Sequence, residues 1–215
     1  MNRTGLMIVD MQNYYLQPES PFSRYFDFLY PGSLDYIRNR ANDIVIPNII
    51  RLKKEFAKRD LPVIYLRLCG EHPDRLDLHR FFQKSYEEGL HRGYSDVYPL
   101  KTDKMSDVIE KLKPSKDDIV FTKTTFSPFS TTVIEEYLLE AGVGRLVMTG
   151  LATSQCVETT GRDASERGFE IIQLHDAQAD YDEITHNASL LSSRGVCGGA
   201  LYDTALFIEM IDDLI

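Results

Sequence analysis

The sequence of 215 residues predicts an α/β fold in three layers, with a doubly wound, mainly parallel sheet of six strands between helices. Short apolar runs of strand length recur along the chain, and stretches of helical length separate them. Strands this apolar are typical of a sheet that is covered on both faces. Regular alternation of strands and helices gives parallel pairing through right-handed crossovers.

Each element can be justified from its own composition. Five apolar runs predict buried strands, and a sixth strand is a candidate: residues 5–10, 62–68, 118–122, 145–150, 170–174 and 196–201. Helices are expected between them, at residues 40–59, 130–141, 156–167, 185–194 and 204–215. In the first of these, Ile44, Val45, Ile49, Leu52 and Phe56 recur at helical spacing.

Two long excursions interrupt the alternation. Residues 17–33 are aromatic and aperiodic, which predicts an ordered loop or short helix beside the carboxyl end of the first strand, and residues 70–99 follow the second strand. Excursions of this length are usually lids, substrate loops or subunit contacts. The chain has no internal repeat and no linker of low complexity, so a single domain over residues 1–215 is expected.

Composition limits the possible partners and location. The three cysteines are odd in number and scattered, and Met1 leads directly into a strand, so a cytoplasmic protein is expected. No apolar run approaches the ~18 residues that span a membrane. The net charge of -9 disfavours nucleic acid as a partner, because such binding depends on a basic surface.

Cys156 is the best candidate for a nucleophile. It follows a predicted strand and a turn of small residues, at or beside the start of a helix. Unpaired N–H groups and the helix dipole at that position favour the thiolate, the reactive form. A small buried apolar residue is the simpler interpretation of a single cysteine. Asp10 and Lys123 also fall at predicted carboxyl ends of strands, where open parallel sheets bind ligands.

Three motifs carry a family resemblance. Residues 150–164 read Gly-x-x-Thr-x-x-Cys-Val-Glu-x-Thr-x-Arg-x-Ala, residues 10–12 read Asp-x-Gln, and Lys123 precedes a Ser-x-Phe-x-x-Thr element at residues 127–132. In their order along the chain, residues 10–12, 123–132 and 150–164, they resemble the isochorismatase-like cysteine hydrolases. The resemblance implies the strand order 3-2-1-4-5-6, which places the first and fourth strands side by side and brings Asp10 beside Cys156.

The resemblance also implies roles for the site residues. Asp10 would transfer protons, Lys123 would orient it and support the thiolate, and Cys156 would attack an amide-type carbonyl to form a thioester. A cis peptide bond between Leu151 and Ala152 would turn the Ala152 N–H toward the oxyanion, together with the N–H of Cys156.

The retained thiol favours the amidohydrolase branch of the superfamily, which resembles N-carbamoylsarcosine, ureidoacrylate and biuret amidohydrolases. Isochorismatases proper do not need a thiol nucleophile, and nicotinamidases carry a metal-binding Asp-x-His that residues 65–73 lack. His72, His79 and His91 are irregularly spaced. We therefore expect hydrolysis of a small amide or ureide C–N bond that releases ammonia or an amine, with no metal and no cofactor.

Substrate contacts are harder to predict. A guanidinium group can bind a carboxylate through two parallel hydrogen bonds, and a side-chain amide can hydrogen-bond a ureido group. Aromatic rings commonly form the walls of a pocket. The candidates on these grounds are Tyr14, Arg24, Arg67, Phe129 and Gln178.

Two further expectations follow from the family resemblance and from the chemistry of thiols. The superfamily is commonly oligomeric, so a homo-oligomer, a dimer or a tetramer, is expected. A binding or redox-sensing protein in which Cys156 is oxidised remains an alternative, as does a nicotinamidase-like or isochorismatase-like hydrolase.

Overall fold

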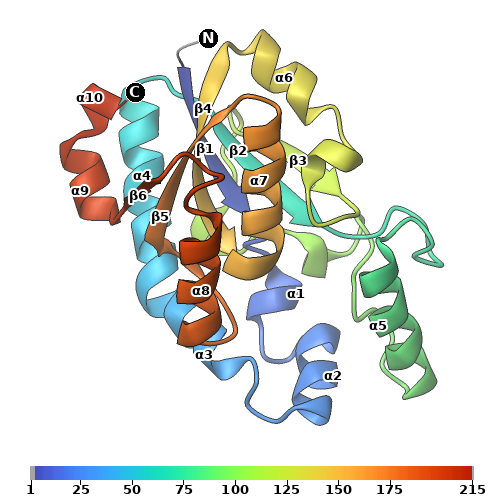
Figure 1. Ribbon diagram of the computed structural model, residues 1–215. Coiled ribbons are helices and arrows are strands. Elements are labelled where there is room, and N and C mark those ends of the chain that lie inside the picture. Colours follow the sequence, from blue (N-terminus) through green and yellow to red (C-terminus); the bar gives the residue numbers. More distant parts are fainter. Residues whose placement is uncertain (1–2, 215) are drawn as a thin grey trace.

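A computed structural model describes residues 3–214 of the chain (Figure 1). Its centre is a sheet of six parallel strands in the order β3-β2-β1-β4-β5-β6. This arrangement confirms the predicted fold class and strand order. The strands are β1 (Arg3–Val9), β2 (Val63–Leu68), β3 (Ile119–Lys123), β4 (Val143–Leu151), β5 (Glu170–Ala179) and β6 (Ala200–Tyr202).

Helices cover both faces of the sheet (Figure 1). They are α1 (Asn13–Leu16), α2 (Pro21–Leu29), α3 (Asp35–Arg40), α4 (Ile46–Lys58), α5 (Arg80–His91), α6 (Ile134–Glu140), α7 (Glu158–Glu166), α8 (Glu183–Ser193), α9 (Thr204–Glu209) and α10 (Ile211–Leu214). Short turns are π-helical at η1 (Ala41–Val45) and η5 (Thr153–Val157), and 3₁₀ at η2 (Lys104–Ser106), η3 (Glu110–Leu112) and η4 (Pro128–Ser130). No helix within residues 3–214 has the length and hydropathy needed to cross a bilayer.

The alternation of side chains along β1 divides the core into two layers. Leu6 and Ile8 pack with Phe56 of α4 on one face, whereas Met7 and Val9 belong to the cluster on the other face, beneath α6 and α7. Successive strand residues point to opposite faces, so one short apolar strand supplies both layers. The central strands are therefore held rigidly, and their carboxyl ends form a fixed edge.

The predicted helix over residues 40–59 is divided into three parts. It consists of the end of α3, the π-helical turn η1 and α4. Pro47 lies at the start of α4 and has no N–H to donate to the turn before it, which explains the wider hydrogen bonding at η1. The last predicted helix is likewise two helices, and Ile215 lies outside the described residues.

The aromatic excursion contains a short helix, as one of the two predicted forms. This is the nine-residue helix α2, which Ser20 caps by accepting a hydrogen bond from the Ser23 N–H at 3.0 Å. Phe22 and Tyr25 are buried in the core, whereas Phe28 and Tyr30 are exposed. Phe22 and Tyr25 therefore stabilise the fold of this chain, whereas Phe28 and Tyr30 remain available at the surface.

Candidate active site

Three predicted site residues lie together at the carboxyl edge of the sheet. Asp10 directly follows β1, Lys123 is the last residue of β3, and Cys156 lies in η5 just after β4. Because β1 and β4 are neighbours where the strand order reverses, Asp10 and Cys156 share the crevice that this topology opens. Lys123 comes from two strands away, about 10 Å at the usual spacing of strands, and its long side chain covers that distance.

Lys123 joins the other two residues. Its Nζ lies 2.8 Å from Asp10 Oδ2 and 3.3 Å from Cys156 Sγ, and it also donates to the Thr125 carbonyl at 3.1 Å. Lys123 is fully buried, and Asp10 and Cys156 are 3% and 5% exposed. The other carboxylate oxygen, Asp10 Oδ1, is buried without a hydrogen-bond partner within residues 3–214. It is the free acceptor of this group.

The buried ion pair determines the protonation states. Burial raises the pKa of Asp10, and the charge of Lys123 opposes that rise. Burial by itself would lower the pKa of Lys123, but the charges of Asp10 and Cys156 raise it, and the net shift is upward. Asp10 and Lys123 are therefore stable as an ion pair whose net charge is zero.

The surroundings of the Cys156 thiol raise its pKa. Burial and then the negative charge of Asp10 raise the pKa of Cys156, and Lys123 opposes them only in part. This shift runs opposite to the contribution expected from the helix start. A thiolate would add a second negative charge beside a single buried cation, which burial disfavours. Asp10 is the acidic group nearest in effect to this thiol.

The turn that carries Cys156 is held from both ends. The Leu151–Ala152 peptide bond is cis, as the resemblance implied. The Ser154 N–H donates to Asp180 Oδ2 at 2.5 Å, and Asp180, fully buried after β5, belongs to the same edge of the sheet. Sequence reasoning missed Asp180, although an acidic residue directly after a strand of this edge was a usable signal.

His186 is a second residue that sequence reasoning missed. Its Nδ1 lies 2.8 Å from Thr153 Oγ1 in η5, and its Nε2 lies 3.1 Å from Arg40 Nη2. Because a guanidinium can only donate, Nε2 accepts, and Nδ1 carries the proton toward Thr153. Burial and the charge of Arg40 lower the pKa of His186 to about 4. The ring is thus a neutral brace between α8 and the cysteine turn.

Gln12 holds the other side of the site. Its Nε2 donates to the carbonyls of Leu68 and Ser106 at 3.1 and 2.7 Å, and its Oε1 accepts from the Leu68 N–H at 2.8 Å. The side chain is fully buried. Gln12 of the Asp-x-Gln motif therefore joins the ends of β1 and β2 and fixes the backbone beside Asp10.

A wall of aromatic side chains borders the three residues. Tyr14 of α1 is 1% exposed and packs edge-to-face against Tyr98, with ring centroids 6.1 Å apart. Burial raises the pKa of Tyr14, and the nearby acidic groups Asp10 and Cys156 raise it further, so its hydroxyl lies within electrostatic range of the nucleophile. Of the predicted substrate contacts, Tyr14 is electrostatically coupled to Asp10 and Cys156, and Phe129 packs against the apolar cluster that includes Cys156.

Comparison with known proteins identifies the family. The model of the isochorismatase domain matches residues 4–205. The chain belongs to the isochorismatase family. Among its relatives, the ureidoacrylate amidohydrolase RutB of Variovorax paradoxus is 31% identical over 99% of this chain and 80% of its own. A probable inactive nicotinamidase of Arabidopsis thaliana is 25% identical over 90% of this chain and 89% of its own.

A solved structure gives the same result. The cysteine hydrolase of Pseudomonas syringae pv. phaseolicola superposes with a TM-score of 0.78 at 26% identity, covering 99% of this chain and 94% of that one. The fold and strand order are therefore those of isochorismatase-like hydrolases.

The remaining predicted contacts of this isochorismatase-family protein lie elsewhere. Arg24 is exposed on α2. Phe129 packs near Phe169, with Arg167 above its ring at 5.1 Å. Gln178 is fully buried in β5, where its Nε2 donates to the Met148 carbonyl at 3.2 Å, across an irregular step in the β4–β5 register.

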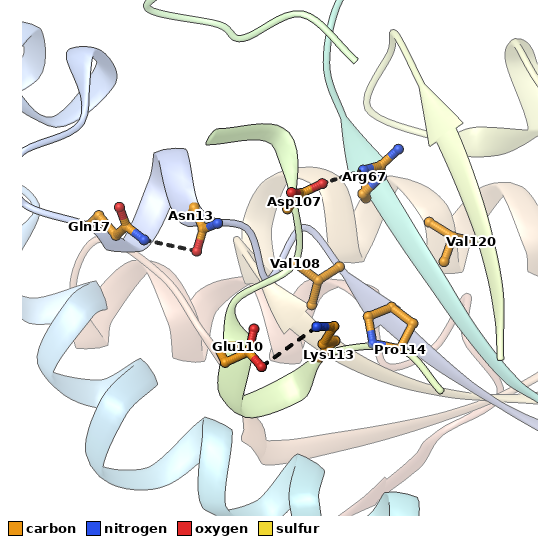
Figure 2. Close-up of a pocket in the computed structure, with 9 residues that line it drawn as sticks. All are labelled: Asn13, Gln17, Arg67, Asp107, Val108, Glu110, Lys113, Pro114 and Val120. Atoms are coloured by element: carbon orange, nitrogen blue, oxygen red, sulfur yellow. Dashed lines mark hydrogen bonds and ion pairs between the residues drawn. The ribbon is translucent and has the colours of Figure 1, made fainter. Parts of the chain in front are cut away.

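Arg67 faces a different pocket, of about 560 Å³ (Figure 2). Its Nη1 lies 3.2 Å from Asp107 Oδ1, and its Nη2 lies 3.3 Å from Thr122 Oγ1. The lining is polar at one end and apolar at Val108 and Val120, and it includes none of the three central site residues. Arg67 is thus engaged in an ion pair at a separate surface.

Another open pocket, also about 560 Å³, is lined by residues that follow Lys123 and Cys156 in the sequence. It is lined by Thr125 and Phe126, which follow Lys123, and by Thr159, which follows Cys156. Within the described part of the chain, no group of three or more His, Cys, Asp and Glu side chains is placed to hold a metal ion. Of the histidines considered for that role, His79 lines this pocket.

Proposed function

We propose that this protein hydrolyses a C–N bond of a small amide or ureide, with Cys156 as the nucleophile. The observation that carries the proposal is the contact of one buried ammonium, Lys123 Nζ, with both Asp10 Oδ2 and Cys156 Sγ. A structural cysteine needs neither a buried carboxylate nor a buried cation beside it, and burying charges is costly unless they are paired.

The first half of the reaction forms the thioester. Asp10, through its free Oδ1, takes the Cys156 proton as the sulfur attacks the carbonyl carbon, and the carbonyl electrons move to oxygen. The backbone N–H groups of Ala152 and Cys156 are the proposed donors to that oxyanion, an effect of about 3 kcal/mol per donor. Asp10 then gives the proton to the departing nitrogen, which leaves as ammonia or an amine.

The second half restores the thiol. Asp10 takes a proton from water, the hydroxide attacks the thioester carbonyl, and the C–S bond breaks as the proton returns to sulfur. The products are an acid, or a carbamate when the substrate is a ureide. Lys123 stays charged throughout, so it keeps Asp10 oriented and stabilises the negative charge on sulfur as it develops.

The relatives favour an amidohydrolase. The relative at 31% identity, RutB, is named for ureidoacrylate, and the similar solved structure is a cysteine hydrolase. An N-carbamoylsarcosine amidase of Arthrobacter is a further relative that cleaves a C–N bond by its name. Other relatives are named nicotinamidase and isochorismatase, so those two functions remain the alternatives.

The test is ammonia release from a panel of ureides and primary amides, with intact-mass detection of a covalent adduct on the protein. We expect release and an adduct with the wild type, neither with Cys156→Ala, and both with the matched control Cys197→Ala. Release that persists in Cys156→Ala would disprove the mechanism. In Asp10→Asn, lost turnover with persistent thiol alkylation would support proton transfer by Asp10 over a purely redox-sensing thiol.

We also propose a homo-oligomer. Large apolar side chains are exposed on two helices, Ile184 and Leu191 on α8 and Phe28 on α2, at 82%, 75% and 57%. Side chains this exposed and apolar are common at contacts between subunits. Light scattering coupled to size exclusion should give a dimer or a tetramer, and a monomer at micromolar concentration would contradict the proposal.

The cysteines suggest a location. Cys69, Cys156 and Cys197 are all buried and free. Proteins with free thiols are typical of reducing compartments. We therefore propose the cytoplasm, which cell fractionation with a specific antibody would test.

A further inference from the structure

Helix α8 presents apolar side chains to solvent and mainly polar side chains to the rest of the protein. Ile184, Ala188 and Leu191 follow one another along its outer face, and Ile184 and Leu191 are 82% and 75% exposed. The buried residues of this helix are His186, Ser189, Leu190 and Ser193. A surface helix normally turns its apolar stripe toward the core. In α8 it is the outer face that is suited to apolar packing.

Hydrogen bonds fix α8 in this orientation. The Ser189 hydroxyl donates to Glu158 of α7 at 2.5 Å, and the Ser193 hydroxyl accepts from Gln173 of β5 at 2.8 Å. A third bond joins His186 to the cysteine turn. Turning the helix to bury its apolar face would break all three bonds. In Figure 1, α8 lies at the front of the molecule, and no described element passes over its outer face.

The two ends of α8 carry opposite charges. Glu183 is the first residue of the helix, and the C-cap Arg194 keeps helical backbone angles, φ -51° and ψ -47°. Both side chains are exposed, and neither has an ion-pair partner within residues 3–214. They are 11 positions apart, about three turns, so they lie on the same side of the helix. The sequence between them contains no Asp, Glu, Lys or Arg.

An antiparallel pair of such helices is self-complementary. A two-fold axis through the middle of α8 would place Glu183 of each copy opposite Arg194 of the other. The same axis would place Ile184 opposite Leu191 of the other copy, with Ala188 at the crossing point. A small side chain there allows the helices to approach to ~8 Å, the short end of the usual range. Charged residues that flank an apolar seam set the partner and the orientation in paired helices.

We propose that α8 is the centre of a two-fold interface between two copies of this chain, in which the two α8 helices pack antiparallel. The inference rests on the proposed homo-oligomer, whose face and orientation it names, and it does not depend on the proposed hydrolysis. Asn187 and Ser192 are exposed on either side of the apolar residues. They begin the polar rim that surrounds the apolar centre of such interfaces.

The first test is light scattering coupled to size exclusion. Leu191→Glu should halve the mass of the wild-type assembly, because it would bury a carboxylate against Ile184 of the other copy. The matched control is Leu139→Glu, an exposed leucine on α6, which should leave the mass unchanged. Circular dichroism checks that both variants are folded.

The outcomes of this test are distinct. An unchanged mass in Leu191→Glu would overturn the proposed face while the homo-oligomer stands on another surface. A wild-type monomer at micromolar concentration would overturn both. Ammonia release tests the hydrolase separately, so a failed interface and a failed hydrolase give different results.

Charge reversal tests the orientation. Glu183→Arg and Arg194→Glu each place like charges at both ends of the helix pair, and each should raise the dissociation constant at least ~fivefold in analytical ultracentrifugation. An equimolar mixture of the two variants restores opposite charges at both ends and should return to within about twofold of the wild type. Mixing cannot repair a local defect in α8. Full affinity in either single variant, or no recovery on mixing, would overturn the antiparallel pairing.

A disulfide tests the crossing point. Ala188→Cys should form a covalent dimer on mild oxidation, because the axis brings the two copies of this residue within the Cβ separation of ~3.5–4.5 Å that a disulfide needs. The native cysteines are buried, so the new thiol is the accessible one. Lys84→Cys, exposed on α5, is the control and should stay monomeric on a non-reducing denaturing gel. Equal cross-linking of the two variants would overturn the crossing at Ala188.

Discussion

Gly150 lies directly against the backbone of Val9, in neighbouring strands that lead to Asp10 and to the turn of Cys156. A Cβ built on Gly150 would be 2.1 Å from the Val9 carbonyl oxygen, and its φ is +107°. β4 can therefore approach β1 closely at the point where Asp10 leaves one strand and the cysteine turn leaves the other. The glycine of the Gly-x-x-Thr-x-x-Cys motif is a requirement of packing.

Gly150→Ala should destabilise the protein by more than the ~1–2 kcal/mol of left-handed strain alone, because the new Cβ also collides with backbone. Gly168→Ala is the matched control, since its φ is +88° and nothing lies within 4 Å of the added Cβ. Urea unfolding measures both. Equal losses of unfolding free energy in the two variants would show that the close approach does not matter.

Lys123→Met should lower the free energy of unfolding by about 3–5 kcal/mol, since it leaves the carboxylate of Asp10 buried without its partner. Adding Asp10→Asn to the same chain removes the unpaired charge and should recover most of that loss. Both variants should lose activity, so the double variant should regain stability without regaining catalysis. If the double variant is as unstable as the sum of the two single variants, the pair is not coupled.

Asp10→Asn should make Cys156 more reactive toward iodoacetamide at pH 8. Asp10 raises the pKa of the thiol and Lys123 lowers it, so removing the carboxylate leaves only the lysine acting on the sulfur. We expect labelling at least threefold faster, roughly half a pKa unit of extra thiolate. Mass spectrometry in the Cys69→Ala/Cys197→Ala background measures it, and slower labelling would contradict this account.

His186 should make stability fall in mild acid. The pKa of its ring is lowered from 6.5 to about 4 in the folded state, so between these values the unfolded chain binds a proton that the folded chain does not. The contribution of His186 to the free energy of unfolding is therefore complete above pH ~6.5. It is lost as the pH falls toward ~4, by at most ~1.4 kcal/mol per pH unit.

His186→Gln should flatten that pH dependence, because the amide can replace both hydrogen bonds of the ring without titrating. His91→Gln is the control, since His91 is exposed at the end of α5 and should leave the slope unchanged. Melting temperatures measured at about six pH values between ~4.5 and ~7 test this, because that spacing resolves the titration of a single group. A slope that is unchanged in His186→Gln would assign the acid sensitivity to other groups.

Local pattern determined much of this protein. The apolar runs predicted the first five strands, because strand length and apolarity are properties of neighbouring residues, whereas the candidate sixth strand at residues 196–201 overlaps β6 only at Ala200 and Leu201. The motifs around Asp10, Lys123 and Cys156 placed each of them at a strand end, and the sheet topology brings such ends together. The helix break at η1 and the capped helix α2 were less predictable, since each depends on a single residue. The break at η1 depends on the N–H that Pro47 lacks, and α2 depends on the hydrogen bond that the Ser20 side chain accepts.

The protonation state and the substrate contacts were decided only by the tertiary structure. Cys156 has a raised pKa because distant segments bury it and place Asp10 beside it, an effect that a helix start read from sequence does not contain. Arg67 and Gln178 are polar residues near strand ends, yet Asp107 and Met148 engage them. Burial and pairing depend on which segments meet in space, so they follow from the fold as a whole and not from any local pattern.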